Sequence, residues 1–171
     1  MNPSTLWLGI GAAVLLFWSV GAFNRLVALR GAIVRGFAPV DEQFRLRHTL
    51  LLRQAEALAH TDPTQAQALL AACAQALAAC DHARAHPGAA GAITSLRLAE
   101  EVLAETRQRI PSPPSGAEAA ALTAEVAASD TTLAFACRQF NERVSRYNSA
   151  VGQFPTWLLA GLFRFRPAGT L

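Results

Sequence analysis

The chain has 171 residues, of which 52% are hydrophobic and 16% charged, and its formal net charge is +3. All 15 basic residues are arginines dispersed along the chain, which excludes the dense basic patch expected of a nucleic-acid-binding protein. The odd number of cysteines, three, excludes a disulfide framework. This length provides one domain and an additional segment.

The first predicted element is a membrane-spanning helix. Residues 1–24 contain no charged side chain, and the apolar run 6–23 covers roughly 27 Å as a helix, close to the thickness of a hydrocarbon core. Trp7 and Trp18 lie toward its ends, where tryptophan favours the membrane interface. A cleaved signal peptide is the alternative, but its apolar run normally follows a positive charge. We therefore expect residues 1–24 to form an uncleaved anchor.

Arginines follow the apolar run directly. Arg25, Arg30 and Arg35 all precede the first acidic residue, Asp41. Positively charged flanks stay on the cytoplasmic side of a membrane. The sequence therefore predicts a single-pass protein with its N-terminus outside and its main domain in the cytoplasm, and it places Arg25 at the interface.

The rest of the chain has the apolar spacing of α-helices and no pattern typical of strands. We expect helices over about 25–61, 63–85, 93–110 and 116–152. Asp62 and Pro63 form an N-cap followed by a proline at the first helical position, and Ser115 is expected to cap the last helix. The predicted fold is all-α: an N-terminal transmembrane helix continuous with a long helix of an antiparallel three- or four-helix bundle, which occupies residues 25–155.

Helix length predicts the topology. The helices over 25–61 and 116–152 are each roughly 55 Å long, and the two between them are much shorter. The last long helix carries a narrow apolar stripe with steps of three and four residues, as in a coiled coil. We expect the two long helices to pack antiparallel, with 63–85 and 93–110 forming a hairpin on the half far from the membrane.

The C-terminal tail, residues 156–171, combines apolar and aromatic side chains with arginines. If the last long helix returns to the bilayer, Trp157, Arg164 and Arg166 are placed at the membrane interface, with the arginines near lipid head groups. Alternatively, this short apolar tail packs on the helices. Composition leaves both possibilities open.

Polar residues on the apolar stripes of the two long helices require partners, because an unpaired buried charge costs several kcal/mol. Residue 24 is expected to lie level with about residue 154. The contacts predicted in this register are Asp41–Arg138, His48–Asp130, and Arg30 with Tyr147 and Asn148. We interpret such contacts as register pins; solvated side chains at the stripe edge are the alternative, and a titrating His48 would make the pair sensitive to pH.

Two segments resemble conserved blocks of the LemA family. The first is "NRLVALRGAIVRGFAPVDEQFRLRHTLL", residues 24–51, and the second is "ACRQFNERVSRYNSAVGQFP", residues 136–155, in which Asn141 and Asn148 match the family pattern. Phe140 stands where the family usually has tyrosine, and Thr49 where it has aspartate, so the chain looks like a divergent member. The resemblance implies a single-pass protein of the bacterial cytoplasmic (inner) membrane with a cytoplasmic helical domain and no firmly attached enzymatic activity.

Motifs for catalysis are missing from the sequence: there is no nucleophile elbow, P-loop, GxGxxG or HExxH. We expect a non-catalytic protein without a cofactor, a metal, a small-molecule substrate or a nucleic-acid partner. The predicted function is a membrane-anchored scaffold or adaptor for protein–protein contacts or self-association at the cytoplasmic face, with membrane lipid and other protein copies as partners. A transmembrane signalling module and a lipid-binding or membrane-remodelling protein are the alternatives.

Overall fold

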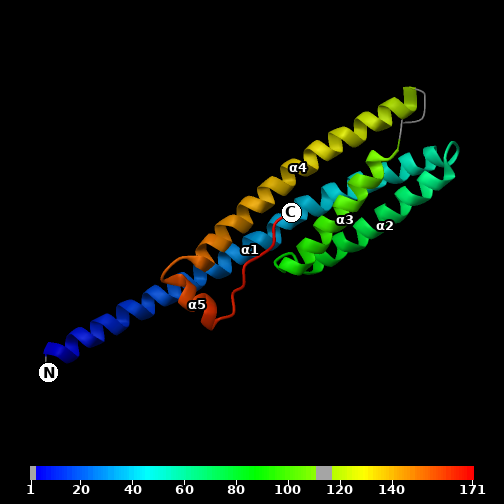
Figure 1. The fold of residues 1–171 in the computed structure, drawn as a ribbon. Helices are drawn as coiled ribbons and strands as arrows, with labels where there is room; N and C mark the ends of the chain where they lie inside the picture. The colour runs from blue at the N-terminus through cyan, green and yellow to red at the C-terminus, as the bar shows by residue number, and fades with distance from the viewer. Residues whose placement is uncertain (1–2, 111–116) are drawn as a thin grey trace.

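The structure is a computed structural model that describes residues 3–110 and 117–171. This part of the chain is all-α and contains no strand (Figure 1). Its helices are α1 (Pro3–Ala59), α2 (Pro63–Ala85), α3 (Ala90–Gln108), α4 (Ala117–Gly152) and α5 (Thr156–Leu162). The predicted fold class is confirmed.

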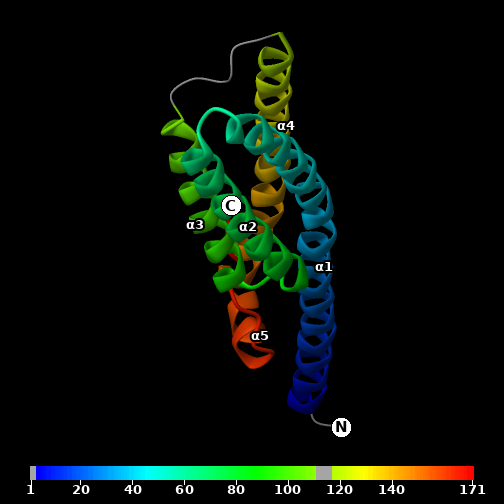
Figure 2. The same ribbon diagram turned by 90° about the vertical axis from the view of Figure 1, so that its right-hand side faces the viewer.

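Helix α1 joins the apolar N-terminal segment to the bundle without interruption. It has 57 residues, extends roughly 85 Å, and stays helical through Pro39. Its N-terminal part projects from the bundle alone (Figures 1 and 2), and almost none of its apolar window is buried. By length and composition α1 is apolar enough to span a membrane.

The bundle has the predicted arrangement. Helix α4 runs antiparallel to α1, and α2 and α3 form a hairpin beside the half of α1 that lies far from its N-terminus (Figures 1 and 2). The rings of Phe37 and Phe140 meet edge-on with their centroids 5.6 Å apart. Phe37 is therefore level with Phe140, within one residue of the predicted register.

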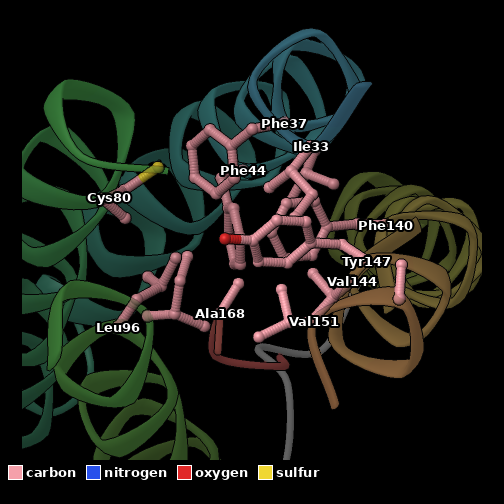
Figure 3. Close-up of a cluster of buried hydrophobic side chains, with 14 of the residues drawn as sticks. Ile33, Phe37, Phe44, Cys80, Leu96, Phe140, Val144, Tyr147, Val151 and Ala168 are labelled. Atoms are coloured by element: carbon pink, nitrogen blue, oxygen red, sulfur yellow. The ribbon is translucent and has the colours of Figure 1, made fainter. Parts of the chain in front are cut away.

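Buried apolar side chains form two clusters along this bundle. The larger one unites α1, α4, the hairpin and the C-terminal tail, and Figure 3 shows Phe37, Tyr147 and Ala168 within it. The smaller one lies between α1, the hairpin and Val126 of α4, and it contains Cys73. Cys73 and Cys80 are free and buried on α2, as their seven-residue spacing predicts.

Helix boundaries follow local capping chemistry. The N–H of Gln65 donates to Asp62 Oδ1 at 3.0 Å, which confirms Asp62 as the cap of α2. Helix α3 begins at Ala90, earlier than the predicted residue 93. The alanines that follow the turn at Pro87 favour helix and add a first turn to α3. The predicted cap Ser115 lies outside the described residues.

Helix α5 brings the chain back to α1. The ring centroid of Phe23 lies 4.8 Å from that of Phe163 and 5.8 Å from that of Phe165. At Arg164 the φ angle is 56°, a left-handed conformation that ends α5, and the N–H of Phe165 donates to the carbonyl of Ala160 at 2.9 Å. The tail beyond this point packs on the bundle (Figure 1), as one of the two open alternatives anticipates.

Candidate functional site

Two asparagines on α4 hold the C-terminal tail. The Asn148 amide donates to the carbonyl of Ala168 at 2.9 Å and accepts from its N–H at 2.8 Å. The Asn141 amide does the same with the backbone of Leu171, at 2.6 and 2.9 Å. Each side-chain amide therefore satisfies both backbone groups of one tail residue, as a neighbouring strand would.

The spacing of the asparagines matches the spacing of an extended chain. Asn148 follows Asn141 by seven positions on the helix, which is roughly 10.5 Å along the axis. Leu171 follows Ala168 by three positions of extended chain, which is roughly 10 Å. This arrangement recognises the backbone of the tail rather than its side chains.

Tyr147 adds a third contact to this set, and we call Asn141, Tyr147 and Asn148 the tail clamp. The Tyr147 hydroxyl donates to the carbonyl of Arg166 at 3.0 Å. Burial raises the pKa of Tyr147, and the positive charge of Arg30 offsets only part of this rise, so the hydroxyl stays a neutral donor.

The close fit of the tail also explains a glycine. A Cβ atom at Gly169 would lie 3.0 Å from Cα of Ala90 and 3.1 Å from Cβ of Ile93. These contacts are with backbone and a stiff branched side chain, so a glycine at residue 169 lets the tail pass closely against the start of α3.

The role of Asn148 in the structure differs from the predicted one. Asn148 was expected to lie opposite Arg30, but its hydrogen-bonding groups are used by the tail. Arg30 and Tyr147 do line the same cleft. The reason is that an extended tail has backbone groups without helical partners, and α4 offers the nearest amides.

Asp41 also has a partner other than the predicted one. Its carboxylate accepts hydrogen bonds from Arg84 Nε of α2 at 2.9 Å and from Cys80 Sγ at 3.4 Å, and a second guanidinium nitrogen of Arg84 forms an ion pair with it at 2.8 Å. Arg138 of α4, its predicted partner, is exposed. Asp41 lies at the edge of the stripe that faces α2, which is why the Asp41–Arg138 prediction is wrong. Burial acts to raise the pKa of Asp41, but the bonds from Arg84 and Cys80 outweigh it and hold this pKa below its usual value.

Asp130 meets Arg107 and Arg47 instead of His48. The Arg107 guanidinium donates two bonds to its carboxylate, at 3.1 and 2.7 Å, and Arg47 lies 3.5 Å away. Arg47 is buried, with 8% of its surface exposed, and it also pairs with Glu100 of α3. The His48–Asp130 prediction is wrong by one residue, which is about 100° around the helix.

Our sequence reasoning missed Arg47, although a signal for it exists. Val40, Phe44, Arg47 and Leu51 follow one another in steps of four, three and four residues, and all are buried. Arg47 is therefore the charged member of the stripe that faces the bundle, where burial requires a carboxylate partner.

A model of the LemA family matches residues 36–171. The chain belongs to the LemA family. The match begins inside α1, beyond residues 24–35 of the first resembling segment, and it includes the alanine-rich hairpin, the tail clamp and the tail. No curated protein and no solved structure matches the chain significantly. LemA is not known as an enzyme family, and within the described part of this LemA protein no group of three or more His, Cys, Asp or Glu side chains is placed to hold a metal ion.

The residues predicted at the membrane interface lie on the exposed surface of this LemA protein. Trp7 is 70% exposed and Trp18 37%, both on the projecting part of α1, and Arg25 follows on the same helix. Trp157 is half exposed on α5. Arg164 and Arg166 line a cleft between the C-terminal tail and the α2–α3 turn.

His48 is expected to make the stability of LemA depend on pH. Partial burial and the positive charge of Arg47 lower the pKa of His48. The folded state then binds fewer protons than the unfolded state, in which this pKa is about 6.5, so stability falls as pH falls from about 6.5 toward the lower folded-state value. The thermal midpoint should decrease over this range, and His48→Gln should reduce the decrease. The exposed His60→Gln is the control, and equal pH slopes for all three chains would refute the assignment.

Proposed function

We propose that this LemA protein is a non-catalytic, membrane-anchored helical scaffold that self-associates through α1 at the cytoplasmic face of the bacterial inner membrane. The observation that supports this proposal is a second apolar line on α1, away from the face that packs on α4. Its members, which we call the outer seam, are Ile10, Ala13, Phe17, Val20, Asn24, Val27, Gly31, Val34 and Ala38.

The outer seam has the spacing of a coiled-coil interface. Its steps alternate between three and four residues over four heptads. Val27 and Val34 are 47% and 51% exposed although they lie beyond the apolar N-terminal segment, where lipid would not cover them. Apolar side chains exposed in regular register favour a protein partner.

A second copy of the chain fits this seam best, because anchored copies share one orientation and one depth. Parallel α1 helices related by a two-fold axis along the membrane normal bring each seam residue next to its own equivalent. Asn24 then occupies a core position at which a polar residue favours parallel pairs in register. Gly31 and Ala13 allow the helix backbones to approach closely.

Flanking charges modulate the proposed pairing. Arg30 and Arg35 lie on either side of the seam and, in parallel pairs, face each other across it. Their repulsion is screened by salt, so the proposed association should strengthen as ionic strength rises.

The scaffold role follows from the length of α1. From Asn24 to Ala59 the helix extends roughly 54 Å, so the end of the bundle at which α2 begins and α3 ends is held far from the membrane on a rigid rod. Paired rods would display two α2–α3 hairpins side by side for partner proteins. Phe163, directly after α5, contacts Phe23 at the end of the apolar run of α1, so we expect the half-exposed Trp157 of α5 to rest on the membrane surface.

Disulfide trapping in membrane vesicles tests the seam. We expect the full chain carrying Val27→Cys and Cys137→Ser to form a covalent dimer on mild oxidation. Ala28→Cys in the same background is the control, because residue 28 is exposed but points about 100° away. The native thiols do not interfere, because burial raises the pKa of Cys73 to about 11 and that of Cys80 to about 12. Equal dimer yields at positions 27 and 28, or none at either, would contradict the proposal.

A further inference from the structure

A cleft of about 500 Å³ lies beside the turn between α2 and α3. Arg30 of α1, Arg84 and His86 at the end of α2, and Arg164 and Arg166 of the tail all line it, with Tyr147 of α4 at its wall. Elements that are far apart in the sequence therefore contribute four arginines to one concave surface, and no acidic side chain within residues 3–110 and 117–171 lines it.

Three of these arginines have no carboxylate partner among the described residues: Arg30, Arg164 and Arg166. Arg84 is neutralised by Asp41 and Asp81, at 2.8 and 2.6 Å. An excess of positive charge in a concave site raises the local concentration of anions and provides the fork-shaped donors that phosphate oxygens match.

The backbone adds to this positive character. Helix α3 begins at the cleft wall, where its N-cap Ala89 makes no side-chain capping bond. Free N–H groups and the helix dipole favour a negative charge at such an end.

The tail arginines are held in place by the clamp. The carbonyl of Arg166 accepts the bond from Tyr147, and Ala168 is fixed by Asn148. Arg164 occupies a left-handed backbone conformation that favours glycine, so an arginine stands at this position at an energetic cost. The clamp therefore fixes the backbone from which the Arg166 side chain reaches the cleft.

The cleft lies close to the apolar part of α1. Arg30 comes six residues after Asn24, which is roughly 9 Å along the helix, so its long side chain can reach back to the head-group phosphates if α1 spans the bilayer. From this geometry we infer that the cleft binds the phosphate group of an anionic ligand, through Arg30, Arg164 and Arg166. An anionic phospholipid and free phosphate share this chemistry.

Native mass spectrometry of the full chain from nanodiscs tests the inference. The first arm uses phosphatidylcholine discs with one fifth phosphatidylglycerol, and the second uses phosphatidylcholine discs with millimolar inorganic phosphate. We expect the wild type to retain bound phosphatidylglycerol in the first arm or phosphate in the second, which identifies the source. Arg30→Gln with Arg166→Gln should weaken this binding by at least about tenfold, because two charge-assisted hydrogen bonds are lost.

Arg138→Gln is the matched control, because Arg138 is exposed on α4 and does not line the cleft. This substitution removes the same charge, and the variant should bind the ligand like the wild type. The single variant Arg30→Gln, at an exposed side chain of α1, guards against misfolding of the double variant and should show a smaller loss. Equal retention by the wild type and both cleft variants, or retention in neither arm, would overturn the inference.

Discussion

Arg47→Ala is expected to destabilise the bundle by about 3–5 kcal/mol, the cost of breaking a buried ion pair by removing one partner. The Arg47 side chain is 9% exposed and that of its partner Glu100 is 20% exposed, so water reaches neither group well. Asp130 loses little stabilisation in this variant, because Arg107 still donates two hydrogen bonds to it. The loss of stability therefore comes mainly from the unpaired Glu100 carboxylate. Chemical unfolding of the full chain in detergent measures the free energy of unfolding.

Two further variants sharpen this test. Arg47→Met combined with Glu100→Leu should recover most of the lost stability, because apolar residues can replace a buried pair with little loss. Arg53→Ala is the matched control: Arg53 and Glu125 lie 3.6 Å apart and are each more than half exposed, so less than about 1 kcal/mol is expected. If Arg47→Ala costs no more than Arg53→Ala, the buried-pair account is wrong.

Asn148→Asp is expected to release the tail, with a local cost of about 3 kcal/mol. The carboxylate can still accept the N–H of Ala168, but it no longer donates to the carbonyl of Ala168 and places negative charge against it. Hydrogen exchange measures the effect at single amides. The amides of Ala168 and Leu171 should lose about a hundredfold in protection, while those of α1 and α4 keep theirs.

Ser149→Asp is the control for the added charge. Ser149 is the next residue on α4 and is exposed, so its substitution leaves both clamp amides in place. Unchanged exchange at residues 168 and 171 in Asn148→Asp would show that the tail is held by packing alone.

The helices and their order were predictable because apolar spacing and helix length carry that information. The predicted helices over 25–61 and 116–152 have equal lengths, which makes their antiparallel pairing the simple solution. The contact of Phe37 with Phe140 confirms this pairing. The continuity of α1 was predictable because the apolar spacing continues on both sides of Pro39, and the helix does pass through this residue.

The polar partners were less predictable, because a change of one residue turns a side chain by about 100°. Arg47, not His48, faces Asp130. Arg84 reaches Asp41 only because the hairpin docks on that side of α1, and an alanine-rich helix gives little indication of which of its faces is buried.

The tail clamp was beyond sequence reasoning for a different reason. Asn141 and Asn148 bind backbone groups, and backbone is the same at every residue, so no pattern in the tail identifies it as their partner. The resemblance to the LemA family drew attention to both asparagines but not to what they hold. Gly169 was the one local signal, and it gains meaning only once α3 lies beside it.

Subunit counting in native membrane vesicles tests the proposed self-association most directly. The full chain carries one fluorophore per copy, and single-molecule photobleaching counts the copies in each particle. We expect mostly two-step bleaching for the wild type, more so at high salt, and mostly one-step bleaching when Val27→Asp and Val34→Asp place charges in the outer seam. One-step bleaching of the wild type, or two-step bleaching that survives both substitutions, would contradict pairing through α1.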